Sequence, residues 1–173
     1  MDIQVKAGDV FGTKNPMWLG KAINSIQKFW SKDGESKYSH SGIIIDNKGT
    51  TFEALWTVTS KNLFEEHKGD GVIIARPIGS SNGGVFDIKR GLMEIFKHKG
   101  KIYPFWRLAM HMFPPLSKIA PLDRLVCSEL TAKYLYLCGA RHHQYQGTNP
   151  DTLADEWRRW KNFEIIFEGT IGE

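Results

Sequence analysis

The sequence has few cysteines and no long hydrophobic run. Its 173 residues include two cysteines, too few for a disulfide-rich scaffold or a four-cysteine zinc site. No uncharged apolar stretch reaches the roughly 18 residues that a membrane span needs. The first residues also lack a basic stretch followed by an apolar run, so no signal peptide is visible. These absences favour a cytoplasmic protein with free thiols.

The composition is that of a folded chain with a real core. Hydrophobic residues make up 41% of the sequence and aromatic residues 12%, which argues against disorder. The length suits one domain of ordinary size, and there is no internal repeat or low-complexity tract. We therefore expect a single domain over residues 1–173.

The positive charge is concentrated in one segment. Residues 87–124 hold eight Lys/Arg against three Asp/Glu, whereas the rest of the chain is close to neutral. The segment is also aromatic, which fits nucleic acid, an anionic membrane surface or an acidic substrate. A solvated helix whose lysine stems cover apolar surface is the alternative. No zinc-finger spacing or RNP-type strand is present, so we expect no nucleic acid, and residues 92–122 are the candidate membrane surface.

Local patterns predict an α+β domain. Apolar runs bounded by turn residues predict strands at residues 10–11, 39–46, 50–56, 71–76 and 163–167. Helical spacing and capping residues predict helices at residues 15–30, 87–99, 126–137 and 150–160. Residues 100–122 are interrupted by prolines and are interpreted as a lid or insertion. Helices flanking a mostly antiparallel sheet define the α+β class.

Cys127 is the candidate nucleophile. It lies at the predicted start of a helix, where free N–H groups and partial positive charge stabilise a thiolate and can bind an oxyanion. The alternative is a buried cysteine that packs as a small hydrophobe. Cys138 lies late in the same helix, about 16.5 Å further along it, and is interpreted as such a core residue.

His40 and Glu53 are the candidate partners of that thiol. His40 precedes an apolar strand among small residues, so its ring has room to take the thiol proton. Glu53 is a carboxylate in a strand that otherwise reads as buried, and a buried carboxylate needs a partner such as His40. A surface histidine and an outward glutamate are the alternatives.

The expected hairpin does not bring the two residues into contact. If Lys48 and Gly49 form a two-residue turn, Glu53 lies across from Ile44. His40 is then about 13 Å further along the strand, so a wider loop or a bulge is required.

No cofactor or metal is expected from the sequence. His142 and His143 are adjacent and would point apart on a strand, and Cys127 is not at ligand spacing from either.

Several short motifs resemble those of circularly permuted NlpC-like papain-fold proteins of the YiiX/YaeF branch. In order, these are Gly8-Asp9-Val10-Phe11, Tyr38-Ser39-His40-Ser41-Gly42-Ile43, Phe52-Glu53-Ala54, Val126-Cys127-Ser128-Glu129-Leu130 and Asn149-Pro150-Asp151-Thr152-Leu153. They span residues 8–155, nearly the whole chain. In that family the histidine and the polar residue precede the cysteine, as they do here.

The resemblance implies a permuted papain-like fold, with a small antiparallel, barrel-like sheet packed on the cysteine helix. It implies Cys127 as nucleophile, His40 as general base and Glu53 as its orienting partner, with Tyr38 as a candidate substrate contact. Trp106 is a further candidate substrate contact, in residues 100–122, where the family signal is least. Family members are thought to cleave amide or ester bonds of peptides, cell-wall fragments or lipids. The function expected is therefore that of a cysteine hydrolase, an amidase, peptidase or esterase, working through an acyl-enzyme. Acyl transfer at a membrane surface and a non-catalytic binding or structural module on the same fold are the alternatives.

Overall fold

A six-stranded antiparallel sheet forms the centre of the protein. The computed structural model describes residues 3–14, 37–54, 58–100 and 127–172. The strand order is β4-β3-β2-β1-β5-β6, and each neighbouring pair is antiparallel. The strands are β1 (Val10–Thr13), β2 (His40–Ile44), β3 (Thr50–Ala54), β4 (Val58–Asn62), β5 (Gly71–Pro77) and β6 (Phe163–Thr170).

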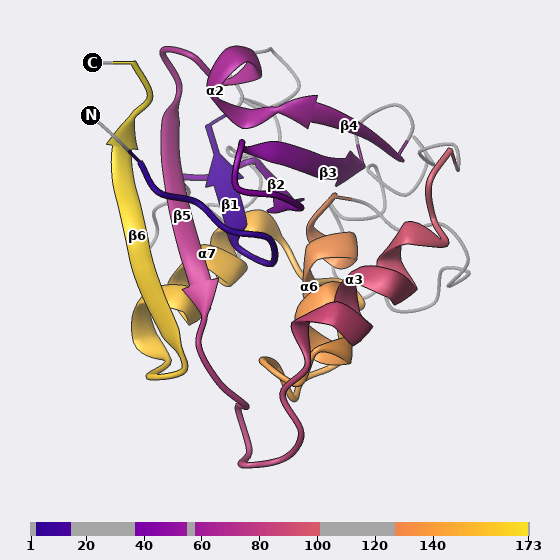
Figure 1. Ribbon diagram of the computed structural model, residues 1–173. Helices are drawn as coiled ribbons and strands as arrows, with labels where there is room; N and C mark the ends of the chain where they lie inside the picture. The colour runs from indigo at the N-terminus through magenta and orange to yellow at the C-terminus, as the bar shows by residue number, and fades with distance from the viewer. Residues whose placement is uncertain (1–2, 15–36, 55–57, 101–126, 173) are drawn as a thin grey trace.

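Helices cover one face of the sheet. They are α3 (Ile88–Phe96), α6 (Cys127–Leu137) and α7 (Pro150–Arg159). Helix α6 packs against β2, α7 packs against β1 and β6, and α3 lies beside α6 (Figure 1). A short helix, α2 (Leu63–Glu66), directly follows the edge strand β4 (Figure 1). The α+β class expected from the sequence is confirmed.

The strands β1, β2, β3 and β5 are buried on both faces of the sheet. Alternate residues of a strand point to opposite faces, so Val10, Ile43 and Phe52 contribute to the core beneath the helices. Their chain neighbours Phe11 and Ile44 belong to a second cluster, which the N-terminal residues and α2 help to cover. This two-sided burial explains why the strands read as continuous apolar runs.

Capping residues define the ends of the helices. The side chain of Asp87 accepts a hydrogen bond from Arg90 N at 3.0 Å, and Asn149 accepts one from Thr152 N at 2.7 Å. Gly139 closes α6 with a φ of +85°, and a Cβ there would lie 2.1 Å from the carbonyl oxygen of Val85. Only glycine meets both requirements, and the helix end predicted at residue 137 is confirmed.

The predicted elements are present wherever the structure describes them, and two more appear. Strand β4 and helix α2 were missed, and β6 runs further than the predicted residues 163–167. The predicted helix at residues 15–30 lies outside the described residues, as does the predicted lid apart from residue 100. The extent of one domain over residues 1–173 stays a prediction. No helix among the described ranges has the length and apolarity to cross a membrane.

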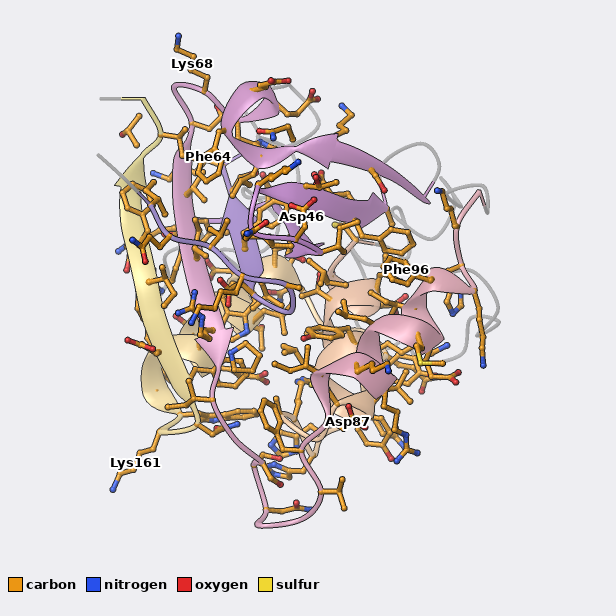
Figure 2. The ribbon with its side chains drawn as sticks, in the orientation of Figure 1. Asp46, Phe64, Lys68, Asp87, Phe96 and Lys161 are labelled. Carbon is orange, nitrogen blue, oxygen red and sulfur yellow. The ribbon has the colours of Figure 1, made fainter. Side chains whose placement is uncertain are left out.

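The hairpin between β2 and β3 has a wider turn than the sequence suggested. Ile43 pairs with Phe52 and Ile44 with Thr51. The turn is held by Asp46, whose carboxylate accepts hydrogen bonds from Lys48 N and Thr50 N, both at 2.9 Å (Figure 2).

The expectation that Glu53 lies across from Ile44 is therefore wrong. The observed register moves Glu53 two residues along, next to Gly42 and diagonal to His40. A Cβ on Gly42 would lie 2.6 Å from Phe11 Cε1 and 2.8 Å from Glu53 Cγ. The missing side chain of Gly42 thus provides the space in which the Glu53 side chain lies.

Gly42→Ala should lower the free energy of unfolding by about 2 kcal/mol, because the added methyl group overpacks a buried site. Gly12→Ala on the neighbouring strand is the matched control, since its added Cβ comes no closer than 3.2 Å to Ile73 Cγ2. Denaturant titration of both variants measures the difference. Equal losses would show that Gly42 has no special steric role.

Candidate functional site

His40 and Glu53 form a buried pair across β2 and β3. His40 Nε2 lies 2.8 Å from Glu53 Oε2, and both residues are almost completely shielded from solvent. The wider turn described above brings them together. The contact that ideal two-residue hairpin geometry did not provide is therefore made.

Glu53 is held as a carboxylate. The hydroxyl of Thr51 donates to its Oε1, so Oε2 is the oxygen that faces the histidine. Burial by itself raises the pKa of Glu53, but the hydrogen bonds and charge of its neighbours, His40 first, outweigh it and bring the pKa well below its usual range. An ionised Glu53 accepts a hydrogen bond from the N–H group at His40 Nε2. Nδ1 of His40 is then available to another partner.

Cys127 is the candidate for that partner. It is the first residue of α6 and is buried. The charge of the His40 ring lowers the pKa of its thiol, which indicates that the two side chains are neighbours.

The electrostatics of this group favour an ion pair. Burial raises the pKa of the Cys127 thiol, but the charge and hydrogen bond of His40 and two backbone N–H groups outweigh it and lower the pKa. Burial likewise lowers the pKa of His40, while the nearby thiolate and Glu53 raise it, with a net upward shift. A thiolate beside an imidazolium is the nucleophilic form of a cysteine.

Polar contacts fix α6 against β2. Ser41 Oγ donates to Thr131 Oγ1 at 3.2 Å, and Thr131 Oγ1 donates to the carbonyl of Cys127 at 3.1 Å. Ser128 Oγ donates to the carbonyl of Thr148 at 2.6 Å, which connects the helix start to the loop before α7. The position of the sulfur is thus set by contacts on both sides of Cys127.

The other cysteine has the core environment expected of it. Cys138 is buried in the cluster beneath the helices, and burial raises the pKa of its thiol to about 11. Its Sγ donates to the carbonyl of Leu135.

Tyr38 and Trp106 were the candidate substrate contacts. The Tyr38 hydroxyl donates to Glu168 Oε1 at 3.0 Å, and the guanidinium of Arg158 lies over its ring. Its role as a substrate contact stays a prediction. Trp106 lies outside the described residues.

His67 is a member of the site that sequence reasoning missed. It follows α2, and its Nε2 lies 3.8 Å from the same Oε2 of Glu53 that faces His40. Phe11 contacts the rings of both histidines, which stack with centroids 6.1 Å apart. His67 belongs to no motif, and the short helix before it was not predicted, so the sequence contained no signal that could have found it.

The expectation that His142 and His143 point apart on a strand is wrong. The residues are not in a strand, and their ring centroids lie 3.8 Å apart on the surface.

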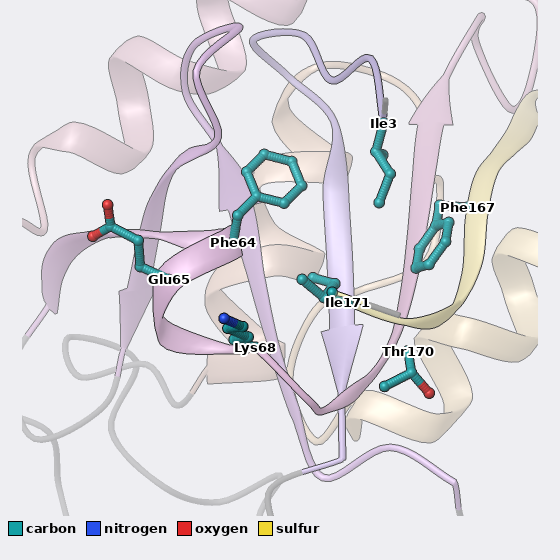
Figure 3. Close-up of a pocket in the computed structure, with 8 residues that line it drawn as sticks. Ile3, Phe64, Glu65, Lys68, Phe167, Thr170 and Ile171 are labelled. Carbon is teal, nitrogen blue, oxygen red and sulfur yellow. The ribbon is translucent and has the colours of Figure 1, made fainter. Parts of the chain in front are cut away.

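A surface hollow lies elsewhere on the protein. Ile3, Phe64, Phe167 and Ile171 contribute apolar side chains to it (Figure 3). Neither Cys127 nor His40 nor Glu53 lines it.

The comparisons with known proteins support the fold. No protein-family model matches the sequence, and no curated protein is significantly similar to it. Among solved structures, the crystal structure of metalloprotein YiiX from Escherichia coli O157:H7, DUF1105, is similar, with a TM-score of 0.57 at 17% sequence identity. The likeness covers 96% of this chain and 99% of that chain. The chain therefore has a YiiX-like fold.

Alkylation should distinguish the two cysteines. In chelator-treated protein near neutral pH, iodoacetamide should modify Cys127 at least about tenfold faster than Cys138, because one pKa unit changes the thiolate fraction about tenfold. Mass spectrometry of the peptides measures both rates, and the urea-unfolded chain, in which the rates should converge, is the control. A faster reaction at Cys138 would contradict the proposed activation of Cys127.

Proposed function

We propose that the protein is a cysteine hydrolase that cleaves an amide or ester bond through an acyl-enzyme. The observation that supports this best is the buried His40–Glu53 pair, together with Cys127 at the start of α6, whose thiol pKa is lowered by the His40 ring. Such a nucleophile, base and orienting carboxylate are recognised by geometry and roles rather than by position in the sequence.

In the first half of the reaction, the Cys127 thiolate attacks the carbonyl carbon and a C–S bond forms. The backbone N–H of Ser128, in the first turn of α6, can hydrogen-bond to the oxyanion. His40 gives its proton to the leaving amine or alcohol as the C–N or C–O bond breaks. The acyl group is then held on Cys127 as a thioester.

In the second half, His40 takes a proton from water, and the hydroxide attacks the thioester. The C–S bond breaks, and the carboxylic acid leaves. Glu53 stays ionised throughout, holds the ring of His40 in one orientation and stabilises its cationic form.

The chain order supports a permuted papain-like arrangement of the NlpC type. His40 and Glu53 precede Cys127, as the family motifs imply, and the fold is YiiX-like. On the same grounds we propose a peptide, cell-wall fragment or lipid-like acyl compound as the substrate.

Acyl transfer at a membrane surface is the second candidate, and one observation favours it. Met93 and Phe96 on α3 are exposed, and the same helix carries Lys89, Arg90 and, at its end, Lys97. Exposed apolar side chains beside basic ones fit an anionic interface. Most of the proposed membrane segment, residues 92–122, lies outside the described residues.

The description of YiiX as a metalloprotein is relevant because this chain also has a set of metal donors. His40, Glu53 and His67 each offer a ligand atom, and these atoms lie within 4.8 Å of one another. The buried Nε2 of His67 has no hydrogen-bond partner within the described part of the chain, so the donors fit a cation. A divalent metal held there would supply a Lewis acid and a bound water of lowered pKa. The Cys127 reaction proposed above does not use it.

Removal of the nucleophile should abolish acylation. Cys127→Ala and Cys127→Ser should show no labelling by a fluorescent activated acyl ester, whereas Cys138→Ala should be labelled like the parent protein. Glu53→Gln should slow labelling by at least about a hundredfold, because the ring loses its orienting charge. Gel fluorescence over time measures all four. Unchanged labelling of Cys127→Ala would favour a non-catalytic module.

Liposome co-sedimentation tests the membrane candidate. If α3 meets a membrane, vesicles containing anionic phosphatidylserine should pellet the protein at low salt, and Met93→Asp should weaken binding severalfold. Val85→Asp changes another exposed apolar residue outside α3 and is the matched control. No binding of the parent protein at low salt would favour a soluble substrate.

A further inference from the structure

We propose that His40, Glu53 and His67 form a binding site for one zinc ion, and that zinc in this site prevents the proton transfers of His40. The inhibitory part of this inference rests on the proposed cysteine hydrolase; the binding part does not. The predicted consequence is a hydrolase that is inactive while zinc is bound and active once zinc is removed.

The three donors are arranged around one point. Oε2 of Glu53 lies 2.8 Å from His40 Nε2 and 3.8 Å from His67 Nε2. In a tetrahedral zinc site with the usual bond lengths, neighbouring ligand atoms are about 3.4 Å apart. The two observed separations bracket this value, so small side-chain movements would bring both nitrogens and the oxygen to ligand distances.

His67 is oriented as a metal ligand would be. Its Nδ1 lies 3.3 Å from Asp70 Oδ2, so the carboxylate of Asp70 can hold the proton on that nitrogen. The lone pair of Nε2 then points toward another carboxylate, that of Glu53, at a separation too long for a hydrogen bond. The His67 side chain is nine-tenths buried, and its Nε2 has no other partner within the described part of the chain.

A cation would satisfy both groups. In the tautomer with the proton on Nδ1, the buried Nε2 acceptor faces a carboxylate, and a metal ion between them binds both. A carboxylate that orients the far nitrogen of a ligating histidine is the usual outer-shell arrangement of metal sites. Asp70 takes that position relative to His67.

The donor types favour zinc over harder cations. Two imidazole nitrogens and one carboxylate oxygen form the ligand set of several zinc sites, with a fourth position left for another ligand. Magnesium prefers oxygen ligands in octahedral geometry. Phe11 packs against both imidazole rings and provides an apolar wall beside the donors.

Metal binding and proton transfer both need the same atoms. In the zinc-free enzyme, Nε2 of His40 lies 2.8 Å from Glu53 Oε2, and in the proposed mechanism it donates its proton to that carboxylate. Zinc takes the lone pair of Nε2, so that proton is released to solvent and the Glu53 hydrogen bond is lost. The ring is then neutral with its remaining proton on Nδ1, and delivering that proton to a leaving group would leave an imidazolate. His40 therefore cannot act as general acid while zinc is bound.

Calorimetry with zinc chloride tests the site without reference to activity. The metal-free Cys127→Ala protein, which keeps all three donors and lacks the reactive thiol, should bind one zinc ion and no magnesium. Adding His67→Gln should weaken zinc binding at least about tenfold, and Asp70→Asn should weaken it about 10–100-fold.

His143→Gln in the same background is the matched control. It removes an imidazole from the surface pair and should leave the affinity for zinc unchanged. Undiminished binding after His67→Gln, or loss of binding after His143→Gln, would overturn the proposed site. The Asp70→Asn variant keeps the test decisive if His67→Gln fails to fold.

Acyl-probe labelling then tests the inhibition. Saturating zinc should suppress labelling of the parent protein at least about tenfold, and a chelator should restore it. In His67→Gln the zinc concentration for half suppression should rise by at least about tenfold. If zinc leaves labelling unchanged or increases it, the proposal that zinc prevents proton transfer by His40 is overturned. A parent protein that remains unlabelled in chelator would instead refute the proposed hydrolase, and calorimetry would still decide the zinc site.

Discussion

The buried carboxylate of Glu53 is the constraint on which the site depends. A charge shielded from water destabilises the fold unless it is paired and hydrogen-bonded. Thr51 satisfies one oxygen and His40 the other. This pairing requires the observed register of β2 and β3. The turn held by Asp46 belongs to that register, and Gly42, which has no side chain, leaves room for Glu53. Local turn chemistry and the position of a charged group are therefore linked.

The same oxygen of Glu53 faces two histidines, and the two proposals therefore share one group. In the proposed hydrolase, the carboxylate stabilises a cationic His40 ring that activates Cys127. In the proposed zinc site, the same carboxylate and both histidines are ligands. The shared carboxylate is the reason that the proposed proton and metal states exclude one another.

The parts of the fold with strong local signals could be predicted from the sequence. Residue type and spacing identified two helix starts. These are the start of α7 after Asn149 and the start of α6 at Cys127. The turn was wrong because the Asp46 side chain replaces a backbone partner, which apolar periodicity cannot show. Strand β4 was missed because its sequence, Val-Thr-Ser-Lys-Asn, is mostly polar and pairs on one side only. His67 enters the site through the tertiary fold alone.

The separation of the site residues along the chain has a consequence for folding. His40 and Glu53 come from the first half of the sequence, and Cys127 arrives from the other side of a long intervening segment. Closing such a loop is entropically unfavourable until the sheet and α6 are packed together. While the chain is still emerging from the ribosome, its cysteine has no imidazole beside it and remains an ordinary, weakly reactive thiol. The reactivity proposed for this thiol therefore depends on completed folding.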